Sequence, residues 1–94
     1  MSVPAAAHFK LLLVEDNPGD ADLARERLSD MPDYAFEVNT VTRLSDAIDV
    51  LKLEPVDAVI LDLNLPDSRG LDTLRSLRKI RREMAIIVLS GAAD

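Results

Sequence analysis

The sequence predicts an α/β fold in which helices cover both faces of a doubly wound parallel sheet, giving three layers. Short apolar runs of strand length alternate with amphipathic segments of helix length along the chain. The apolar runs are nearly continuous, which is typical of parallel strands buried on both faces. The 94 residues are enough for one domain.

The first half of the chain contains two strands and the helix between them. We expect strands at 9–14, FKLLLV, and at 36–41, FEVNTV. The helix between them begins after Asn17, a favourable N-cap, with Pro18 in its first turn, and ends near Asp30. The residues expected on its buried face are Leu23, Ala24 and Leu28.

The second half continues the alternation. A helix is expected at 43–53, a strand at 56–61, a helix after Gly70 and a strand at 85–90. The apolar stripe of the first of these helices consists of Leu44, Ala47, Ile48 and Leu51. The expected inner residues of the second are Leu71, Leu74, Leu77 and Ile80.

Composition excludes several classes of protein. The net charge of −6 argues against a nucleic-acid-binding domain. The chain has no cysteine, so it has no disulfide framework or thiolate metal site, and we expect a reducing, cytoplasmic location. No apolar run is long enough to span a membrane. Residues 1–8 lack the features of a signal peptide, and we expect a tail there and the domain at 9–94.

Acidic residues follow two of the predicted strands. Glu15 and Asp16 end the first strand, and Asp62 ends the third. If the second and third strands flank the first, the winding reverses between strands one and three, and the three carboxylates converge there. Acids at strand ends can instead stabilise the start of the following helix. That alternative suits Asp62 less well, because its helix begins only after Gly70.

Three clustered carboxylates repel one another, so either some of them hold protons or a cation joins them. The available ligands are oxygen atoms, with no histidine or cysteine nearby. Such a set favours a hard ion, and Mg²⁺ commonly uses one or two carboxylates together with a phosphate oxygen. We therefore predict a magnesium site with phosphate chemistry.

Three motifs then identify a family. LLLVEDNPGDADL, VDAVILDLNLPDSRGL and IIVLSGA occur in this order, and together they resemble the receiver domains of two-component response regulators, such as CheY. The resemblance covers nearly the whole chain after residue 8. It implies a flavodoxin-like (CheY-like) sheet of strand order 2-1-3-4.

The resemblance also implies a role for each matching residue. Asp62 is the phosphoacceptor, which takes phosphate from a sensor histidine kinase or a phosphotransfer protein. Asp16 binds Mg²⁺ directly, Glu15 acts mainly through a bound water, and Asn64 offers its main-chain carbonyl. The Ser90 hydroxyl bonds to the phosphoryl group in the active state. Such a domain is a two-state signalling switch rather than an enzyme.

The family usually continues with a fourth helix, a fifth strand and a fifth helix, whereas the given sequence ends at Asp94. The family's active-site lysine belongs to that fifth strand, and none of Lys10, Lys52 and Lys79 matches it. We therefore expect impaired phosphorylation with metal binding retained. The strand at 85–90 is then an exposed edge, which predicts self-association.

Three further interpretations stay open. The chain could be an interaction or dimerisation module that is not phosphorylated. It could be a metal-dependent phosphatase of the haloacid dehalogenase type, although Asn64 stands where such enzymes carry a second acid. A basic cluster could bind an acidic partner or nucleic acid, but a solvated helix face is favoured because no aromatic residues accompany it. The cluster consists of Arg69, Arg75, Arg78, Lys79, Arg81 and Arg82.

Overall fold

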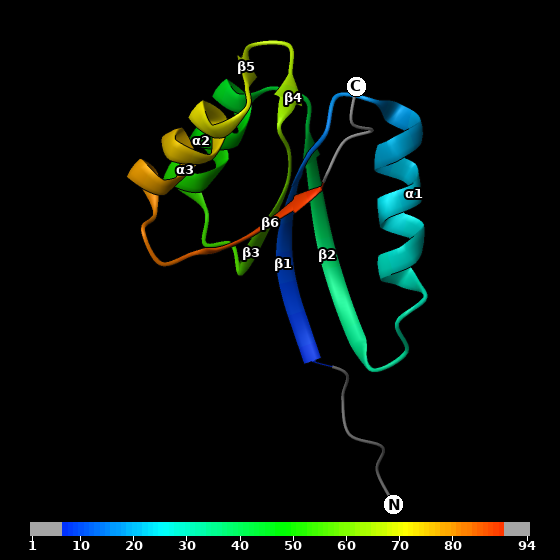
Figure 1. Cartoon of the computed structure of the whole chain (residues 1–94). Coiled ribbons are helices and arrows are strands. Elements are labelled where there is room, and N and C mark those ends of the chain that lie inside the picture. Colours follow the sequence, from blue (N-terminus) through cyan, green and yellow to red (C-terminus); the bar gives the residue numbers. More distant parts are fainter. Residues whose placement is uncertain (1–6, 90–94) are drawn as a thin grey trace, which may run out of the picture.

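The computed structural model describes residues 7–89 and contains a four-stranded parallel sheet between helical layers. Helix α1 lies on one face, and α2 and α3 lie on the other (Figure 1). The sheet strands are β1 (Ala7–Val14), β2 (Tyr34–Val41), β3 (Ala58–Asp62) and β6 (Ala85–Leu89). The helices are α1 (Pro18–Ser29), α2 (Leu44–Leu53) and α3 (Leu71–Ile80). The order β2-β1-β3-β6 confirms the predicted fold and strand order.

Strand β1 lies at the centre of this arrangement because it pairs with β2 on one side and with β3 on the other. The expected strand at 56–61 instead runs over Ala58–Asp62. Asp57 comes just before β3 and is hydrogen-bonded to Lys10 of β1. Its amide donates to the Lys10 carbonyl at 2.8 Å, and its carboxylate accepts from the Lys10 amide at 2.7 Å.

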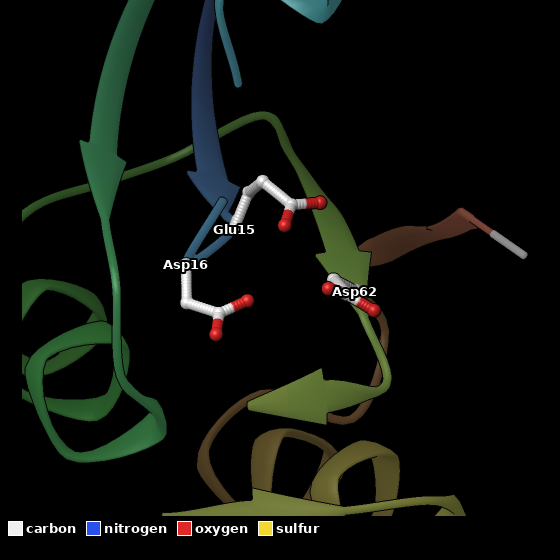
Figure 2. Close-up of side chains that lie close together, drawn as sticks. All are labelled: Glu15, Asp16 and Asp62. Carbon is white, nitrogen blue, oxygen red and sulfur yellow. The ribbon is translucent and has the colours of Figure 1, made fainter. Parts of the chain in front are cut away.

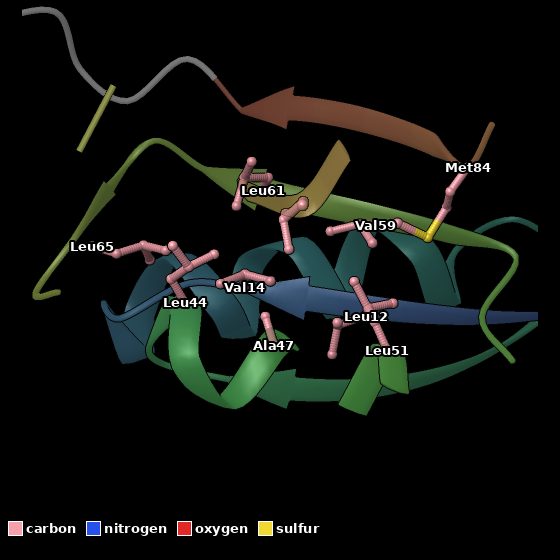
Figure 3. Packing of buried hydrophobic residues seen from close by; sticks show 10 residues of the cluster. Leu12, Val14, Leu44, Ala47, Leu51, Val59, Leu61, Leu65 and Met84 are labelled. Carbon is pink, nitrogen blue, oxygen red and sulfur yellow. The ribbon is translucent and has the colours of Figure 1, made fainter. Parts of the chain in front are cut away.

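Alternate residues of the strands supply two hydrophobic clusters. The larger one lies between the sheet and the layer of α2 and α3, and Figure 3 shows α2 directing its apolar stripe at the strands. Its central members are Leu12, Val14, Val59, Leu61, Leu44, Ala47 and Leu51. The smaller cluster packs against α1 and consists of Leu11, Leu13, Ala21 and Ile60. Both clusters hold β1 and β3 in place next to each other.

Two predicted inner residues are exposed. Leu23 is 47% exposed and Leu71 is 59% exposed. The buried residue of α1 is Ala21, and Leu23 lies on the opposite side of the helix from the stripe that Ala21 begins. Leu71 lies in the same way opposite Thr73, which is completely buried in α3. The predictions for these two leucines are therefore wrong.

A short hairpin occupies the segment between β3 and Gly70, for which the sequence predicts neither a strand nor a helix. It consists of β4 (Asn64–Leu65) and β5 (Ser68–Arg69), and strands of two residues are too short to show a periodicity in the sequence. The Gly70 amide donates to the Leu63 carbonyl at 2.8 Å and closes the hairpin. Gly70 has a φ of 65°, a conformation that favours glycine.

The turn of this hairpin supports the start of α2. Asp67 accepts hydrogen bonds from the Leu44 amide at 2.8 Å and from the Ser45 amide at 3.0 Å. The helix's own N-cap, Arg43, makes no side-chain capping bond. Asp67 therefore caps a helix that lies more than twenty residues earlier in the chain.

None of the helices within 7–89 is long and apolar enough to span a membrane.

The Asp67 cap leads to a stability prediction. Desolvation raises the pKa of Asp67, but the Ser45 and Leu44 amides outweigh it, and the pKa lies below its usual value. A lowered carboxyl pKa stabilises the fold above the unfolded pKa, and the contribution is lost as the pH falls through the folded value. We expect Asp67→Ala to lower the free energy of unfolding by about 0.5–1 kcal/mol at neutral pH. The difference should shrink as the pH falls below about 4.

Urea unfolding of both proteins at several pH values measures this difference. Asp33→Ala is the matched control, because Asp33 is exposed and no side-chain hydrogen bond involves it among the described residues. An equal loss in the two variants, or a loss that does not depend on pH, would contradict capping by Asp67.

Candidate functional site

The register of β1 and β3 brings the predicted acids together. Val14 lies opposite Leu61, so the next residues, Glu15 and Asp62, lie side by side at the carboxyl ends of the two strands. Figure 2 shows both side chains and that of Asp16 at this edge. One carboxylate oxygen from each of the three residues lies within 4.8 Å of the other two. Glu15 and Asp62 are buried, whereas Asp16 is exposed.

Each buried acid is oriented by the amide of an asparagine two residues later. The Asn17 amide donates to Glu15 Oε1 at 3.0 Å, and the Asn64 amide donates to Asp62 Oδ1 at 3.0 Å. Asn17 also caps α1, because its Oδ1 accepts from the Asp20 amide at 3.0 Å. Asn17 therefore both caps α1 and orients Glu15.

Burial raises the pKa of Glu15 to about 7. The hydrogen bond from the Asn17 amide opposes this shift, while the neighbouring carboxylates of Asp62 and Asp20 add to it. Near neutral pH the site thus holds a carboxyl group that is close to releasing its proton. A bound cation would favour the deprotonated form.

The acids open into a cavity of about 500 Å³, which we call the acidic pocket. Its lining residues are Glu15, Asp16, Asn17, Pro18, Asp20, Asp62, Asn64, Leu65, Pro66 and Arg69. The donor set fits Mg²⁺, since it offers several carboxylate oxygens within reach of one ion and leaves room for water and for a phosphate oxygen. The side chains of Glu15, Asp16 and Asp62 and the carbonyl of Asn64 would hold the ion.

Four of the five predicted site residues therefore gather in one place, and the fifth, Ser90, lies outside the described residues. The sequence reasoning did not assign two lining residues to the site, Asp20 and Arg69. Asp20 lies in the first turn of α1, four residues after Asp16, and this closeness to the end of the strand in the chain was the available signal. Arg69 was grouped with the basic residues of the following helix, and its place in β5 could not be read from the sequence.

Comparisons with known proteins agree with this geometry. The model of the response regulator receiver domain matches residues 11–94. The cell cycle transcriptional regulator CtrA of Caulobacter vibrioides is 34% identical over 86 residues, which cover 92% of this chain and 36% of that protein. The chain thus spans about a third of the length of this curated relative.

Solved structures show the same fold. The MaeR response regulator bound to beryllium trifluoride superposes with a TM-score of 0.78 at 26% identity, over 92% of this chain and 70% of that one. A complex of the histidine kinase ThkA with the response regulator TrrA matches with a TM-score of 0.78 at 27% identity, over 92% of this chain and 72% of the matching one. The chain belongs to the family of response regulator receiver domains.

The raised pKa of Glu15 predicts how stability depends on pH in the metal-free protein. A carboxyl group whose folded pKa is raised stabilises the fold below its unfolded pKa, and this contribution is lost as the pH rises through the folded value. The window runs from about 4.5 to about 7. We expect Glu15→Gln, which keeps the side chain neutral, to be more stable than the wild type at pH 8 and to flatten the pH dependence.

Chemical unfolding in the presence of a chelator at pH 5 and pH 8 measures this effect. Glu83→Gln, at an exposed position, is the control. Adding Mg²⁺ at pH 8 should reverse the order of stability, since the wild type offers the ion a negatively charged carboxylate where the variant has a neutral amide. A wild type that is as stable as Glu15→Gln at pH 8 without metal would contradict the assignment of the shift to Glu15.

Proposed function

We propose that this domain receives a phosphoryl group on Asp62 from a sensor histidine kinase or a phosphotransfer protein, in a reaction that depends on Mg²⁺. The observation that carries the proposal is the meeting of Glu15 and Asp16 with Asp62 at the carboxyl edge of the sheet. The carboxylate of Asp62 would be the nucleophile, while the carboxylates of Glu15 and Asp16 would supply the negative charge that attracts a cation.

In the proposed step an oxygen of Asp62 attacks the phosphorus atom of a phosphohistidine. The phosphorus–nitrogen bond breaks, and its electron pair returns to the imidazole, which takes up a proton. Mg²⁺, when bound, would offset charge on the oxygen atoms around phosphorus. The Asn64 amide fixes Oδ1 of Asp62, so the nucleophile is aligned before the donor arrives. Alignment and charge compensation are the main requirements of phosphoryl transfer.

The comparisons support this function through the family. ThkA is a histidine kinase in complex with the response regulator TrrA, and MaeR was solved with beryllium trifluoride. We infer a histidine kinase as partner, a cytoplasmic location and a switch rather than an enzyme as the role of this domain. The domain would occupy 9–94 after a tail at 1–8, except that Ala7 and His8 pair with β2 and so belong to the sheet. The contact of the Ser90 hydroxyl with the phosphoryl group stays a prediction.

Phosphorylation can be tested by mass spectrometry after incubation with Mg²⁺ and acetyl phosphate. We expect a mass gain of one phosphoryl group in only part of the wild-type protein, because none of Lys10, Lys52 and Lys79 matches the family's active-site lysine. Asp62→Asn should show no gain, and neither should the wild type in the presence of a chelator. Asp49→Asn changes an exposed acid on α2 in the same way and should be phosphorylated like the wild type. A gain that persists in Asp62→Asn would show that another residue is the acceptor.

A second candidate function is that of an interaction module that pairs with another copy of the chain. Among the described strands, β6 pairs only with β3, and its Ile87 and Val88 are 54% and 40% exposed. An apolar edge of this kind favours pairing between chains. Absence of phosphorylation with Mg²⁺ binding intact would favour this function. Light scattering that gives a monomer at high protein concentration would exclude it.

A further inference from the structure

The acidic pocket contains one positively charged residue among those that the structure describes, and this residue is Arg69. The charged residues that share the pocket with it are Glu15, Asp16, Asp20 and Asp62. The three ion pairs found within 7–89 involve other arginines, so none of them neutralises Arg69. Its charge therefore acts on whatever enters the pocket.

The hairpin holds Arg69 at this place. Arg69 lies directly opposite Asn64 in the β4–β5 pair, and directly opposed residues direct their side chains to the same face. Both residues line the pocket. Gly70, the residue that follows Arg69, closes the hairpin because its amide donates a hydrogen bond to the Leu63 carbonyl. The hairpin stands at the carboxyl edge of the sheet, where the acids converge (Figure 1).

Three other arginines of this part of the chain have contacts of their own. Arg75 pairs with Asp72 on the surface of α3. Arg78 donates to the carbonyls of Arg82 and Met84, and Arg81 donates to carbonyls at the end of α2. The bonds of Arg78 and Arg81 go to carbonyls at or just after the C-terminal ends of helices, as is usual for arginine. Arg69 is set apart from them because it belongs to the pocket and not to α3.

We propose that Arg69 is the cation of the acidic pocket, which weakens the binding of Mg²⁺ and receives the phosphoryl group of the incoming donor. This inference rests on the proposed function. A dianionic phosphoryl group meets repulsion from the four acids, and an arginine offers a planar pair of N–H donors that fits two of its oxygen atoms. The same positive charge repels a divalent cation in the same pocket. Arg69 thus acts in opposite directions on the two ligands.

Arg69→Gln separates this role from a structural one. By isothermal titration of the full 94-residue chain we expect Mg²⁺ to bind more tightly, and beryllium trifluoride at saturating Mg²⁺ to bind more weakly, each by roughly two- to fivefold. Both changes should shrink as salt is added, because exposed charges are screened. Arg69→Lys keeps the charge, so it should leave Mg²⁺ affinity unchanged and restore only part of the affinity for beryllium trifluoride.

Arg82→Gln is the control, since it removes the same charge from an exposed position outside the pocket. Equal effects of the two glutamine variants, or weaker binding of both ligands to Arg69→Gln, would overturn the role of Arg69. A wild type that binds Mg²⁺ but takes no phosphoryl group on Asp62 would overturn the proposed function, and the Mg²⁺ titrations would still decide whether Arg69 opposes the metal. A wild type that binds no Mg²⁺ would overturn both.

Discussion

The parallel pairing of β1 with β3 is the interaction on which the rest of the structure depends. It sets Val14 against Leu61, and the next residue of each strand is an acid at the edge of the sheet. A shift of one residue would turn the apolar side chains of β3 to the opposite faces and would break both clusters at once. The hydrophobic core therefore determines the geometry of the acids, although no acid belongs to it. Burial of Val59 and Leu61 in this way places Asp62 where its charge is costly.

A second constraint links the site to α2. Neither end of this ten-residue helix is capped by one of its own side chains. Asp67, from the hairpin that follows Asp62, binds the amides at its start, and Arg81 donates to the carbonyls of Leu51 and Glu54 at its end. A negative group at the start and a positive group at the end both suit the helix dipole. The hairpin that carries Asn64 and Arg69 is thus attached to α2 as well as to β3.

Much of the fold could be predicted from the sequence, because continuous apolar runs and helical stripes record burial directly. The strand order followed from the family motifs, and the meeting of Glu15, Asp16 and Asp62 followed from that order. Errors occurred where burial does not depend on hydrophobicity alone. Leu23 and Leu71 are apolar but lie on outer faces, while Ala21 and Thr73 fill the tight contacts. The hairpin depends on a glycine with positive φ and on contacts distant in sequence, such as that of Asp67 with Leu44, which no local pattern records.

The acidic pocket combines two opposing demands on the same groups. Without a cation, buried and closely spaced carboxylates destabilise the fold as they ionise. Burial first, and then the neighbouring carboxylates of Asp62 and Asp20, raise the pKa of Glu15 for this reason. A cation relieves the conflict, but the four acidic side chains of the pocket outnumber the two charges of one divalent ion, so they still oppose the entry of a phosphoryl donor. Backbone amides of Asn17 and Asn64 ease the first demand by orienting the acids without neutralising them. Arg69 addresses the second, because a fixed positive charge moderates the metal affinity and remains in the pocket when the donor arrives. The position of one arginine in a two-residue strand thereby bears on both ligands of the site.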